Sequence, residues 1–562
     1  MDFKSYIAEK IAAATEGDKE NIFTLIEKPK DEAMGDAAFP CFSLSKVLRK
    51  APNMIAADLA EKITADDVIG EVKAVGGYLN FFFNKKLFVS EIAEKVLEEG
   101  EDYGKCSEGE GKTVVIDYSS PNIAKPFHIG HLFSTSVGNS LAKIYSFLGY
   151  KVERVNHLGD WGTQFGKVIS AYKRWGDKAV VEKDPITELN KLYVKFHEEA
   201  EKDSALEDEG RREFHLLETG DTENYNLWKW FRDVSLEEYK RVYERMGVGF
   251  DSYNGEAFYM DKMDGVIAEL KEKNMLTLSE GAYIVEFDDM PPSIVLKQDG
   301  STIYTTRDLA AAEYRNKTYN FDKNIYVVGL PQSLHFKQIF AILEKLGKDY
   351  AKDCVHVGFG TVKFATGAMS TRSGNVVLLE TVLSEAINKT AEIMKNNGNA
   401  IDDIESASES VGIGAIFYTF LKNSREKDII FDWDDILDFI GESGPYVQYS
   451  YARGKSVLRK AEIKDFSGAS FDYDITPEEY SLCKLLSEFT DTVKAAAEKN
   501  EPFYITRYVT NVAKAFNKFY NTTPILKGEE NVQKARLLIT EATTVCIKNA
   551  LALLGINTVE RM

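Results

Sequence analysis

The stretch "SSPNIAKPFHIGHLFSTSVGN", Ser119 to Asn139, decides the fold of this chain. It places His128 and His131 three positions apart around Gly130, although the chain has only 7 histidines in 562 residues. With 39 glycines in the chain, composition alone predicts a His-x-Gly-His pattern about 0.006 times. Chance is therefore a poor explanation, and the histidine pair indicates a functional site.

The segments on either side of the pair predict a nucleotide-binding unit. "TVVIDY", 113–118, is a short apolar, β-branched run typical of a buried strand, and a helical pattern runs from His131 to Leu148. A strand, a loop and a helix in this order form the ligand-binding unit of doubly wound α/β folds. Ligands bind there at the carboxyl ends of parallel strands.

Further strand candidates predict the rest of the same parallel sheet, because strand and helix patterns alternate around them. The expected strands are "KVERVNHLGD" at 151–160, "AYIVEF" at 282–287, "SIVLKQDG" at 293–300, "NIYVVG" at 324–329 and "CVHVGFGTV" at 354–362.

We expect five segments along the chain, separated by changes in composition and periodicity. They are a small α/β domain at 1–110, the first half of the nucleotide-binding domain at 111–170, a charged helical insertion at 171–248, the second half at 249–440 and a helical bundle at 441–562.

Composition predicts a soluble, cytoplasmic protein with reduced cysteines. The first residues lack the apolar core of a signal peptide, and no apolar run approaches the ~20 residues of a membrane span. The five cysteines include no C-x-x-C pair, which argues against a disulfide framework and against zinc.

The acidic charge is unevenly distributed along the chain. Lys and Arg number 69 and Asp and Glu 89, so the formal net charge is −20. Residues 441–562 hold 16 basic and 15 acidic side chains, which is +1 and leaves −21 for residues 1–440. Phosphate contacts need Lys and Arg, so the helical bundle is the segment in which basic faces are permitted.

A helix that begins near His128 would point its free N–H groups and positive dipole end into the ligand cleft, where a polyphosphate binds. His128 and His131 would then share a helix face and donate to phosphate oxygens, while Gly130 leaves room for a purine. For a lone histidine, local hydrogen bonding in the core or on the surface is the commoner role.

These residues resemble the class I aminoacyl-tRNA synthetases, whose HIGH motif is His128 to His131. The second signature of the class, KMSKS, is matched loosely by "AMSTRSGN", with Ser373 in place of the second lysine. The resemblance implies that ATP is bound by His128, Gly130, His131, Met369, Ser370, Arg372 and His335. It also implies that His128, His131, Lys125 and Arg372 stabilise charge during the reaction, the two cations standing in for the missing lysine.

More motifs narrow the resemblance to the arginyl-tRNA synthetase family. They follow the order of that family from one end of the chain to the other. The motifs are "KPKDEAMGDAAFP", "GGYLNFFF", "SSPNIAKPFHIGH", "NHLGDWGTQFG", "YTTRDLAAAEYR", "YVVGLPQSLHFKQIF", "GPYVQYSYAR" and "LLGINTVERM". The fold expected is therefore a Rossmann-type catalytic domain with an N-terminal α/β domain and a C-terminal all-α anticodon-binding bundle.

A guanidinium substrate needs carboxylates, because its N–H donors match carboxylate oxygens two at a time. The resemblance assigns this role to Glu256 and Asp308 with Tyr304, and the α-amino group of arginine to Asp117, Asn122 and Gln332. Two alternatives stay open. Asp308 could form an ion pair with Arg307 or Arg315 of its own helix, and Glu256 could be a surface acid. His335 could simply cap a helix.

The resemblance also implies tRNA contacts at both ends of the chain. In the bundle they fall on Tyr449, Arg453, Arg561 and Met562, and the amino-terminal domain would contact the tRNA elbow. Aromatic side chains among basic ones can stack on unpaired bases. The alternative is that the aromatics of the bundle, namely Phe516, Phe519 and Tyr520, belong to its core.

The resemblance thus implies a member of the arginyl-tRNA synthetase family, a monomer that uses L-arginine, ATP with Mg²⁺, and tRNA(Arg). The family also implies that arginine activation requires bound tRNA. Two rivals are another HxGH nucleotidyltransferase, similar to pantothenate synthetase, and a tRNA-binding paralogue without activity. The first predicts that residues 441–562 are dispensable, and the second predicts tRNA binding without turnover.

Overall fold

The structure, a computed structural model, describes residues 1–562 except 298–302, 365–366, 369–377, 397–402 and 467. The chain folds as two compact units. One comprises Met1–Tyr103, Arg453–Phe489 and Asn511–Ile547, and the other comprises Gly104–Ala452, Thr490–Thr510 and Lys548–Met562.

The amino-terminal part of the first unit is a three-stranded antiparallel sheet, in the order β1-β3-β2, covered by helices. Alternating apolar residues of β3 and the inner faces of α1 and α4 form its core, which includes Ile7, Leu59 and Phe81. Its elements are α1 (Phe3–Thr15), α2 (Lys19–Leu25), β1 (Ala37–Pro40), α3 (Ser45–Leu48), α4 (Pro52–Lys62), β2 (Ile69–Val75), β3 (Tyr78–Phe83) and α5 (Lys85–Glu99).

The second unit is built around a four-stranded parallel sheet in the order β10-β9-β4-β5. The strands are β4 (Thr113–Asp117), β5 (Lys151–Val155), β9 (Lys323–Gly329) and β10 (Cys354–Phe359). Asp117 pairs in register with Val155 on one side and with Tyr326 on the other. The carboxyl ends of the three strands therefore meet at one edge, as the strand patterns predicted.

Two expected strands of this sheet lie elsewhere. "AYIVEF" and "SIVLKQDG" supply β7 (Ala282–Val285) and β8 (Ser293–Lys297), which join β6 (Thr277–Ser279) in a separate antiparallel sheet. Leu278 and Ile294 are exposed on it. Strands with one solvent-exposed face are typical of antiparallel sheets, whereas the strands of a parallel sheet are covered on both faces. The prediction was wrong because short apolar runs look alike in both settings.

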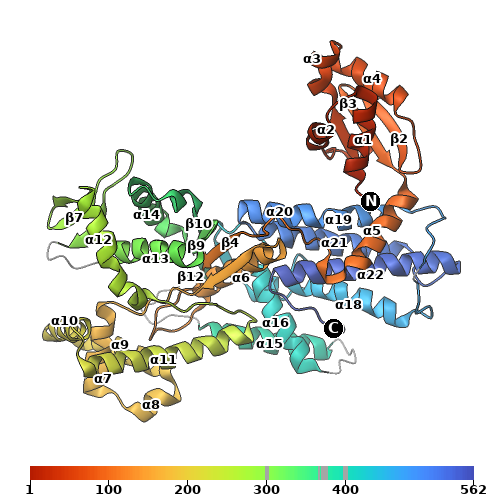
Figure 1. The fold of residues 1–562 in the computed structure, drawn as a ribbon. Coiled ribbons are helices and arrows are strands. Elements are labelled where there is room, and N and C mark those ends of the chain that lie inside the picture. Colours follow the sequence, from red (N-terminus) through yellow and green to blue (C-terminus); the bar gives the residue numbers. More distant parts are fainter. Residues whose placement is uncertain (298–302, 365–366, 369–377, 397–402, 467) are drawn as a thin grey trace. The chain divides into compact units, whose positions relative to one another are not determined.

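Helix α6 (Ile129–Phe147) carries the histidine motif at its start and packs on β4, β5 and β9. Its side chains are buried on nearly every side from Ile129 to Tyr145, which is typical of a helix in the middle of a large domain. Figure 1 shows the strands of the sheet between α6 on one side and α13 (Tyr304–Tyr319) with α14 (Ser333–Lys345) on the other.

Helices fill the charged segment that follows β5. Asp184 and Asp221 cap two of them, each accepting a backbone N–H with its side chain. In Figure 1 the long helix α11 runs from α7 and α10 to α15 (Leu379–Asn396) and α16 (Ile404–Leu421). The helices are α7 (Thr163–Trp175), α8 (Lys178–Lys183), α9 (Pro185–Ala200), α10 (Ala205–Glu218), α11 (Thr222–Arg245) and α12 (Met263–Glu272).

Helices also dominate the chain after the parallel sheet. Phe516 and Phe519 are buried in α21, whereas Tyr520 is 41% exposed, so the core alternative holds for the two phenylalanines. The small strands β11 (Val362–Phe364), β12 (Gly367–Ala368) and β13 (Ile429–Phe431) form a fourth sheet. The helices are α15 (Leu379–Asn396), α16 (Ile404–Leu421), α17 (Trp433–Ile436), α18 (Gly444–Lys460), α19 (Pro477–Ser487), α20 (Phe489–Lys499), α21 (Phe503–Thr522) and α22 (Glu530–Leu553).

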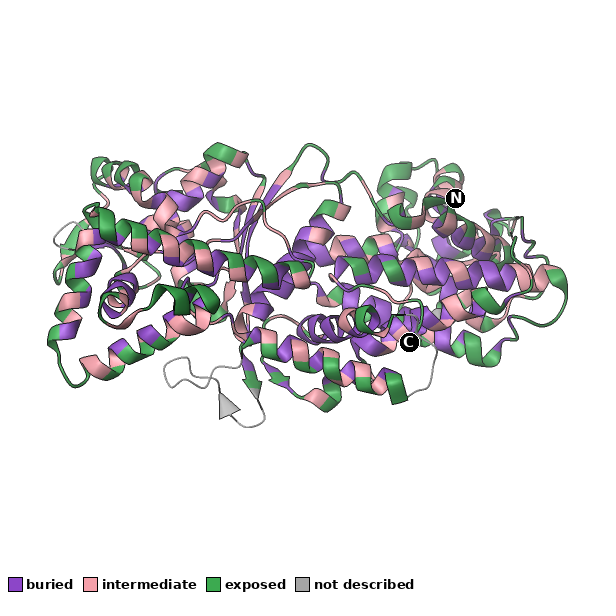
Figure 2. Ribbon diagram, turned by 90° about the horizontal axis from the view of Figure 1, so that it is seen from below, coloured by how far each residue is buried: buried purple, intermediate pink, exposed green. Residues whose placement is uncertain are grey.

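Burial follows the inner faces of these elements. In Figure 2 the buried residues line the strands of the parallel sheet and one side of most long helices, and the opposite sides are exposed. The five cysteines are free thiols, four of them buried. Among the described residues, no helix is both long enough and apolar enough to cross a bilayer.

Gly138 lets α6 approach the end of β4. A Cβ atom at Gly138 would lie 2.2 Å from Cγ of Tyr118, far inside van der Waals contact. We therefore expect Gly138→Ala to lower the free energy of unfolding by about 1–3 kcal/mol through overpacking. Thermal unfolding measures this effect.

Gly265→Ala in α12 is the matched control, because nothing lies within 4 Å of its Cβ position. Alanine at a free helical glycine raises stability by up to about 1 kcal/mol. Equal melting temperatures for the two variants would contradict the packing of α6 on Tyr118.

Candidate active site

The predicted site residues gather where the chain leaves β4 and β9. From β4 the chain continues through α6 to β5 on one side, and from β9 it continues through α14 to β10 on the other. This reversal is the topological switch point at which ligands bind in doubly wound sheets. Asp117 ends β4 and Gly329 ends β9, so the loops that begin at 118 and 330 border the site.

The two histidines form a stacked pair at the start of α6. His128 is the N-cap residue, and its Nδ1 accepts the N–H of Gly130 at 3.1 Å. Nδ1 of His131 accepts the N–H of His128 at 3.2 Å, and the ring centroids are 3.8 Å apart. His128 is therefore the residue that caps the helix and not part of it, and its ring stacks on that of His131 at the helix start.

The hydrogen bonds assign the tautomer of both rings. Because each Nδ1 accepts, the proton of the neutral imidazole lies on Nε2. Burial lowers the pKa of His128, and burial together with the neighbouring His128 lowers the pKa of His131. Both rings are neutral near pH 7, and each offers one Nε2–H donor.

The loop between β4 and α6, residues 118–128, is strained. Ser119, Ser120 and Ala124 have left-handed backbones, with φ of 70°, 45° and 59°. Each such residue costs about 1–3 kcal/mol and persists only where the surroundings hold it. The holding bonds include those from Ser119 N–H to Ser134 Oγ at 2.9 Å and from Ile123 N–H to the Gly159 carbonyl at 3.1 Å.

Lys125 lies in this loop, close to the histidines. Its charge lowers the pKa of both His128 and His131, and burial lowers its own pKa. Nζ lies 5.4 Å from the centroid of the Tyr193 ring. Within the described residues it pairs with no carboxylate, so its charge remains available to an anion.

Glu256 begins the short 3₁₀ helix η4 (Glu256–Lys262) and is only 23% exposed at its side chain, so it is not a surface acid. Its N–H donates to the Leu158 carbonyl at 2.9 Å, and the N–H of Ala257 donates to Oδ1 of Asp160 at 2.8 Å. Burial raises the pKa of Glu256 to about 7, against the opposing charge of Arg307.

Asp308 pairs with a residue of another helix. Its Oδ2 lies 2.6 Å from Nε2 of His335 in α14, so the alternative of a pair with Arg307 or Arg315 is wrong. His335 does not cap the helix, since α14 starts after Gln332. The ring of Tyr304 lies 5.0 Å from the His335 ring.

The resident partner of Glu256 is Arg307, the residue before Asp308. Nη2 of Arg307 lies 3.7 Å from Oε2 of Glu256, and Nε of Arg307 is buried with no hydrogen-bond partner among the described residues. Arg307 thus links the Glu256 segment to the start of α13, where Asp308 follows it, and the charge of Asp308 raises the pKa of Glu256. Gln332 is exposed at the start of α14.

Asp117 is a buried, paired acid. It accepts hydrogen bonds from Nη2 of Arg315 at 2.7 Å and from Oγ of Ser120 at 2.9 Å. Arg315 is only 1% exposed, so its charge is buried with that of Asp117. Asn122 is exposed in the loop, and its Oδ1 lies against Gly159, where a Cβ would approach it to 2.0 Å.

Several residues that hold the site were not predicted. Arg315 belongs to "YTTRDLAAAEYR" and Asp160 to "NHLGDWGTQFG", so both motifs signalled them without a role. Helix α11 gave no such signal, because its charged sequence resembled a surface insertion. Helix α11 nevertheless reaches the loop after β4 and Asp160 in the loop after β5, through Trp228, Arg232, Ser235, Tyr239 and Tyr243.

The predicted tRNA-binding residues lie in different surroundings. Arg453 donates a hydrogen bond to Asn517 and has its guanidinium 5.1 Å from the Tyr520 ring. Met562 is buried in an apolar cluster against which Tyr449 packs, whereas Arg561 is exposed. Met369, Ser370, Thr371, Arg372 and Ser373 of the KMSKS-like segment lie outside the described residues.

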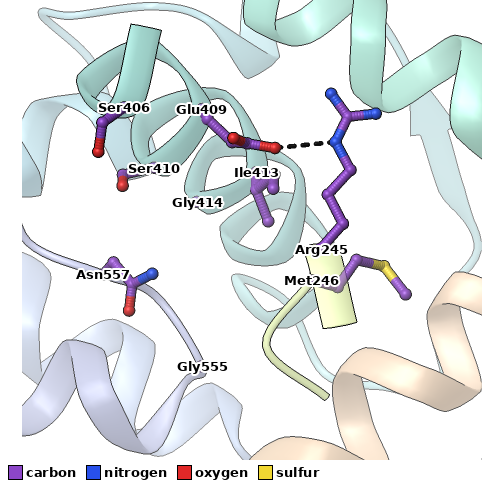
Figure 3. Close-up of a pocket in the computed structure, with 9 residues that line it drawn as sticks. All are labelled: Arg245, Met246, Ser406, Glu409, Ser410, Ile413, Gly414, Gly555 and Asn557. Carbon is purple, nitrogen blue, oxygen red and sulfur yellow. Dashed lines mark hydrogen bonds and ion pairs between the residues drawn. The ribbon is translucent and has the colours of Figure 1, made fainter. Parts of the chain in front are cut away.

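A pocket of about 180 Å³ lies at the carboxyl end of α11 and holds none of the predicted site residues. Figure 3 shows Arg245 of α11 and Glu409 of α16 joined across it, with Asn557 on the opposite wall. Nε of Arg245 lies 2.8 Å from Oε1 of Glu409. The described residues contain no group of three or more His, Cys, Asp or Glu side chains arranged to hold a metal ion.

Three family models match the chain. Residues 92–433 match the model described as tRNA synthetases class I (R), catalytic domain. Residues 447–562 match the DALR anticodon binding domain, and residues 1–83 match the arginyl tRNA synthetase N terminal domain. The parallel sheet and its paired histidines are thus those of a class I aminoacyl-tRNA synthetase.

Full-length relatives agree with these matches. The arginine--tRNA ligases of Clostridium acetobutylicum and Clostridium perfringens are each 55% identical to this chain over 566 residues, which cover 100% of both proteins. The fold matches the arginyl-tRNA synthetase of Thermus thermophilus with a TM-score of 0.82 at 24% identity, over 99% of both chains. The chain belongs to the arginyl-tRNA synthetase family.

Asp160 ties the Glu256 segment to α11, so its loss should be costly. It is 1% exposed, and it accepts from Nε of Arg232 at 3.0 Å as well as from Ala257. We expect Asp160→Ala to lower the free energy of unfolding by about 3–5 kcal/mol, since it strands a charged partner. Asp160→Asn keeps an acceptor for Ala257 and should cost less.

The control is Asp251→Asn, which breaks a pair with Arg154 whose side chains are 39% and 36% exposed. Exposed pairs contribute about 0–1 kcal/mol. Chemical unfolding of the three variants gives the ranking, and an Asp160→Ala effect no larger than that of Asp251→Asn would contradict the anchoring role of Asp160.

Proposed function

We propose that this chain is an arginine--tRNA ligase, which activates L-arginine with ATP and transfers it to the 3′-terminal ribose of tRNA(Arg). The observation that carries the proposal is a pair of acids in linked segments, Glu256 beside Arg307 and Asp308 beside His335, since two carboxylates suit a guanidinium. Family membership and the full-length relatives support the same activity.

In the proposed recognition of arginine, the guanidinium of the substrate replaces the present partners of Glu256 and Asp308. A guanidinium offers five N–H donors in a planar fork, which satisfies carboxylates two bonds at a time. Glu256 and Asp308 now face Arg307 and His335, so the substrate replaces resident cationic or N–H partners. The ring of Tyr304 lies next to His335, the partner of Asp308, and completes the proposed guanidinium site. Lysine has a point charge and would leave acceptors unpaired, at a cost of about 1–3 kcal/mol.

The α-amino group of arginine is assigned to Asp117, Asn122 and Gln332. Asp117 ends β4 and is held by Arg315, so its position is fixed before substrate arrives. A carboxylate with one oxygen on Arg315 and one on Ser120 still has lone pairs for an ammonium group. This arrangement directs the substrate carboxylate toward the start of α6.

Activation joins the arginine carboxylate to the α-phosphorus of ATP. An oxygen of the carboxylate attacks, the bond to the β-phosphate oxygen breaks, and pyrophosphate leaves. No enzyme nucleophile is needed, so the chain contributes positioning and charge stabilisation. His128 and His131 donate hydrogen bonds from Nε2–H to the phosphate oxygens, and the positive charge of Lys125 stabilises the negative charge of the phosphates. Gly130 admits the adenine, and Met369, Ser370 and Arg372 complete the nucleotide site.

Mg²⁺ enters with ATP as part of the substrate. It prefers oxygen ligands and retains water, so phosphate oxygens can supply most of its coordination. We assign no zinc and no resident metal to the chain.

Transfer RNA is assigned to both ends of the chain. In the amino-terminal domain, Phe42 and Tyr78 are 54% and 36% exposed with ring centroids 5.4 Å apart, and such rings can stack on bases of the tRNA elbow. In the bundle, Arg453 lies over the exposed Tyr520. Arg561 would meet the anticodon loop, with the buried Met562 fixing its backbone.

The domain boundaries of the sequence analysis, a monomeric state and a cytoplasmic location belong to the same proposal. The segment 171–248 differs from the expected charged insertion in one respect. Its last helix, α11, contributes to the site.

Arginine-dependent exchange between ATP and pyrophosphate is the direct assay of the activity. We expect exchange with arginine when tRNA(Arg) is present, and at least about 100-fold less with lysine, since unpaired buried acceptors reject a mismatched substrate. Exchange with arginine in the absence of tRNA would support the proposed activity but would contradict the requirement for bound tRNA. Tight tRNA binding with no exchange under any condition would favour a silent paralogue.

The pH dependence of arginine use should follow Glu256. Its raised pKa of about 7 keeps the carboxyl protonated below that pH, and the neutral form cannot pair with a guanidinium. The kcat/KM for arginine should therefore rise about tenfold per pH unit up to pH 7 and level off above it. Charges of Arg307, Asp308 and Asp160 surround this group.

The kcat/KM for ATP is the internal control, because burial lowers the pKa of His128 and of His131, whereas it raises that of Glu256. Glu256→Gln should abolish the arginine limb of the profile and reduce kcat/KM at pH 8. An unchanged limb in that variant would assign the titration to another group.

A further inference from the structure

Helix α11 places a row of hydroxyl groups along the strained loop between β4 and α6. Ser235, Tyr239 and Tyr243 follow one another at helical spacing on its buried face. Tyr243 Oη lies 2.6 Å from Ser119 Oγ, and Ser235 Oγ accepts the N–H of Ala124 at 3.3 Å. Both partners have left-handed backbones, so α11 touches the loop at two of its strained residues.

Tyr239 holds the turn that carries Lys125. Its hydroxyl is shared between the carbonyl oxygens of Asn122 at 2.8 Å and Lys125 at 2.7 Å, on either side of strained Ala124. The ring is 1% exposed and lies 5.4 Å from the ring of Phe127. One hydroxyl thus fixes the backbone on both sides of the αL residue that orients Lys125.

In the part of the chain that the structure describes, Tyr239 is the hydrogen-bond donor to the carbonyl groups of Asn122 and Lys125. The carbonyl groups of Asn122 and Lys125 lie outside regular secondary structure, and a buried carbonyl left without a donor is unfavourable. An αL alanine relaxes toward ordinary φ unless its neighbours are held. Such a relaxation turns the Lys125 side chain away from the histidines, because it rotates the backbone directly before that residue.

We propose that Tyr239 is a positioning residue for arginine activation, acting through Lys125: its hydroxyl keeps the Asn122–Lys125 turn in the conformation that aims the lysine at the leaving pyrophosphate. This inference rests on the proposed function, because it takes adenylate formation as the step that Lys125 serves. Tyr239 itself touches no substrate.

The test is a double-mutant cycle on kcat for arginine-dependent ATP–pyrophosphate exchange, with tRNA(Arg) present and both substrates saturating. Lys125→Met should lower kcat about 100-fold, the size expected for one charge-stabilising group. Tyr239→Phe should lower it about tenfold, because small misplacements of such a group are costly. In the Lys125→Met background, Tyr239→Phe should change kcat less than twofold.

Tyr145→Phe is the matched control. Tyr145 is also 1% exposed, and its hydroxyl meets the Ala497 carbonyl at 2.9 Å and Oδ1 of Asn500 at 2.8 Å and accepts from Nζ of Lys323 at 3.0 Å. Tyr145→Phe should lower the melting temperature at least as much as Tyr239→Phe does, with kcat unchanged. A purely structural role for Tyr239 predicts equal effects of the two variants on both quantities.

Ser235→Ala provides a second route if Tyr239→Phe fails to fold. It removes only the acceptor for Ala124, and we expect about a threefold loss of kcat that disappears in the Lys125→Met background. Multiplicative losses in either cycle, or an undiminished kcat for Lys125→Met, would overturn the positioning role. A wild-type chain with no arginine-dependent exchange would instead overturn the proposed function.

Discussion

The site depends on one constraint, a backbone turn that would not persist alone. Ser119, Ser120 and Ala124 carry left-handed φ angles within six residues, directly between the central strand β4 and the histidine motif. Strain of this kind survives where the surroundings over-determine the conformation. Here α6 supplies Ser134, the β5 loop supplies Gly159, and α11 supplies its hydroxyl row. The parallel sheet fixes where the loop starts, and these three contacts fix where it points.

A second theme is that the acids assigned to the substrate already have partners. Asp117 is paired with Arg315, Asp308 with His335, and Glu256 more loosely with Arg307. Buried carboxylates without partners would be costly, and under the proposed function these resident groups hold the acids until the guanidinium of arginine binds. The 3.7 Å separation and the raised pKa mark Glu256 as the least satisfied of the three. Exchange of partners therefore favours a ligand with several planar donors over one with a point charge.

The sequence predicted the parts of this arrangement that depend on local pattern. β4 and α6 follow from "TVVIDY" and the helical run after it, and the paired histidines follow from their rarity. It did not predict that His335 pairs with Asp308 or that Arg315 pairs with Asp117, because those contacts depend on how α13 packs against α14 and against the end of β4. α11 was missed for a physical reason. Its polar composition suited a solvated insertion, yet Ser235, Tyr239 and Tyr243 use their hydroxyls on buried backbone.

The central claim is that the turn before α6 is held in place before any substrate binds. Hydrogen–deuterium exchange of the free protein, read from peptides covering Ser119–His131, tests it most directly. The amides of Ser119, Ile123, Ala124 and His128 donate within the protein. The account predicts slow exchange of these amides, comparable with that of β4, and little change when arginine and ATP are added. Exchange at the rate of an unstructured chain, slowing only with substrates, would contradict it.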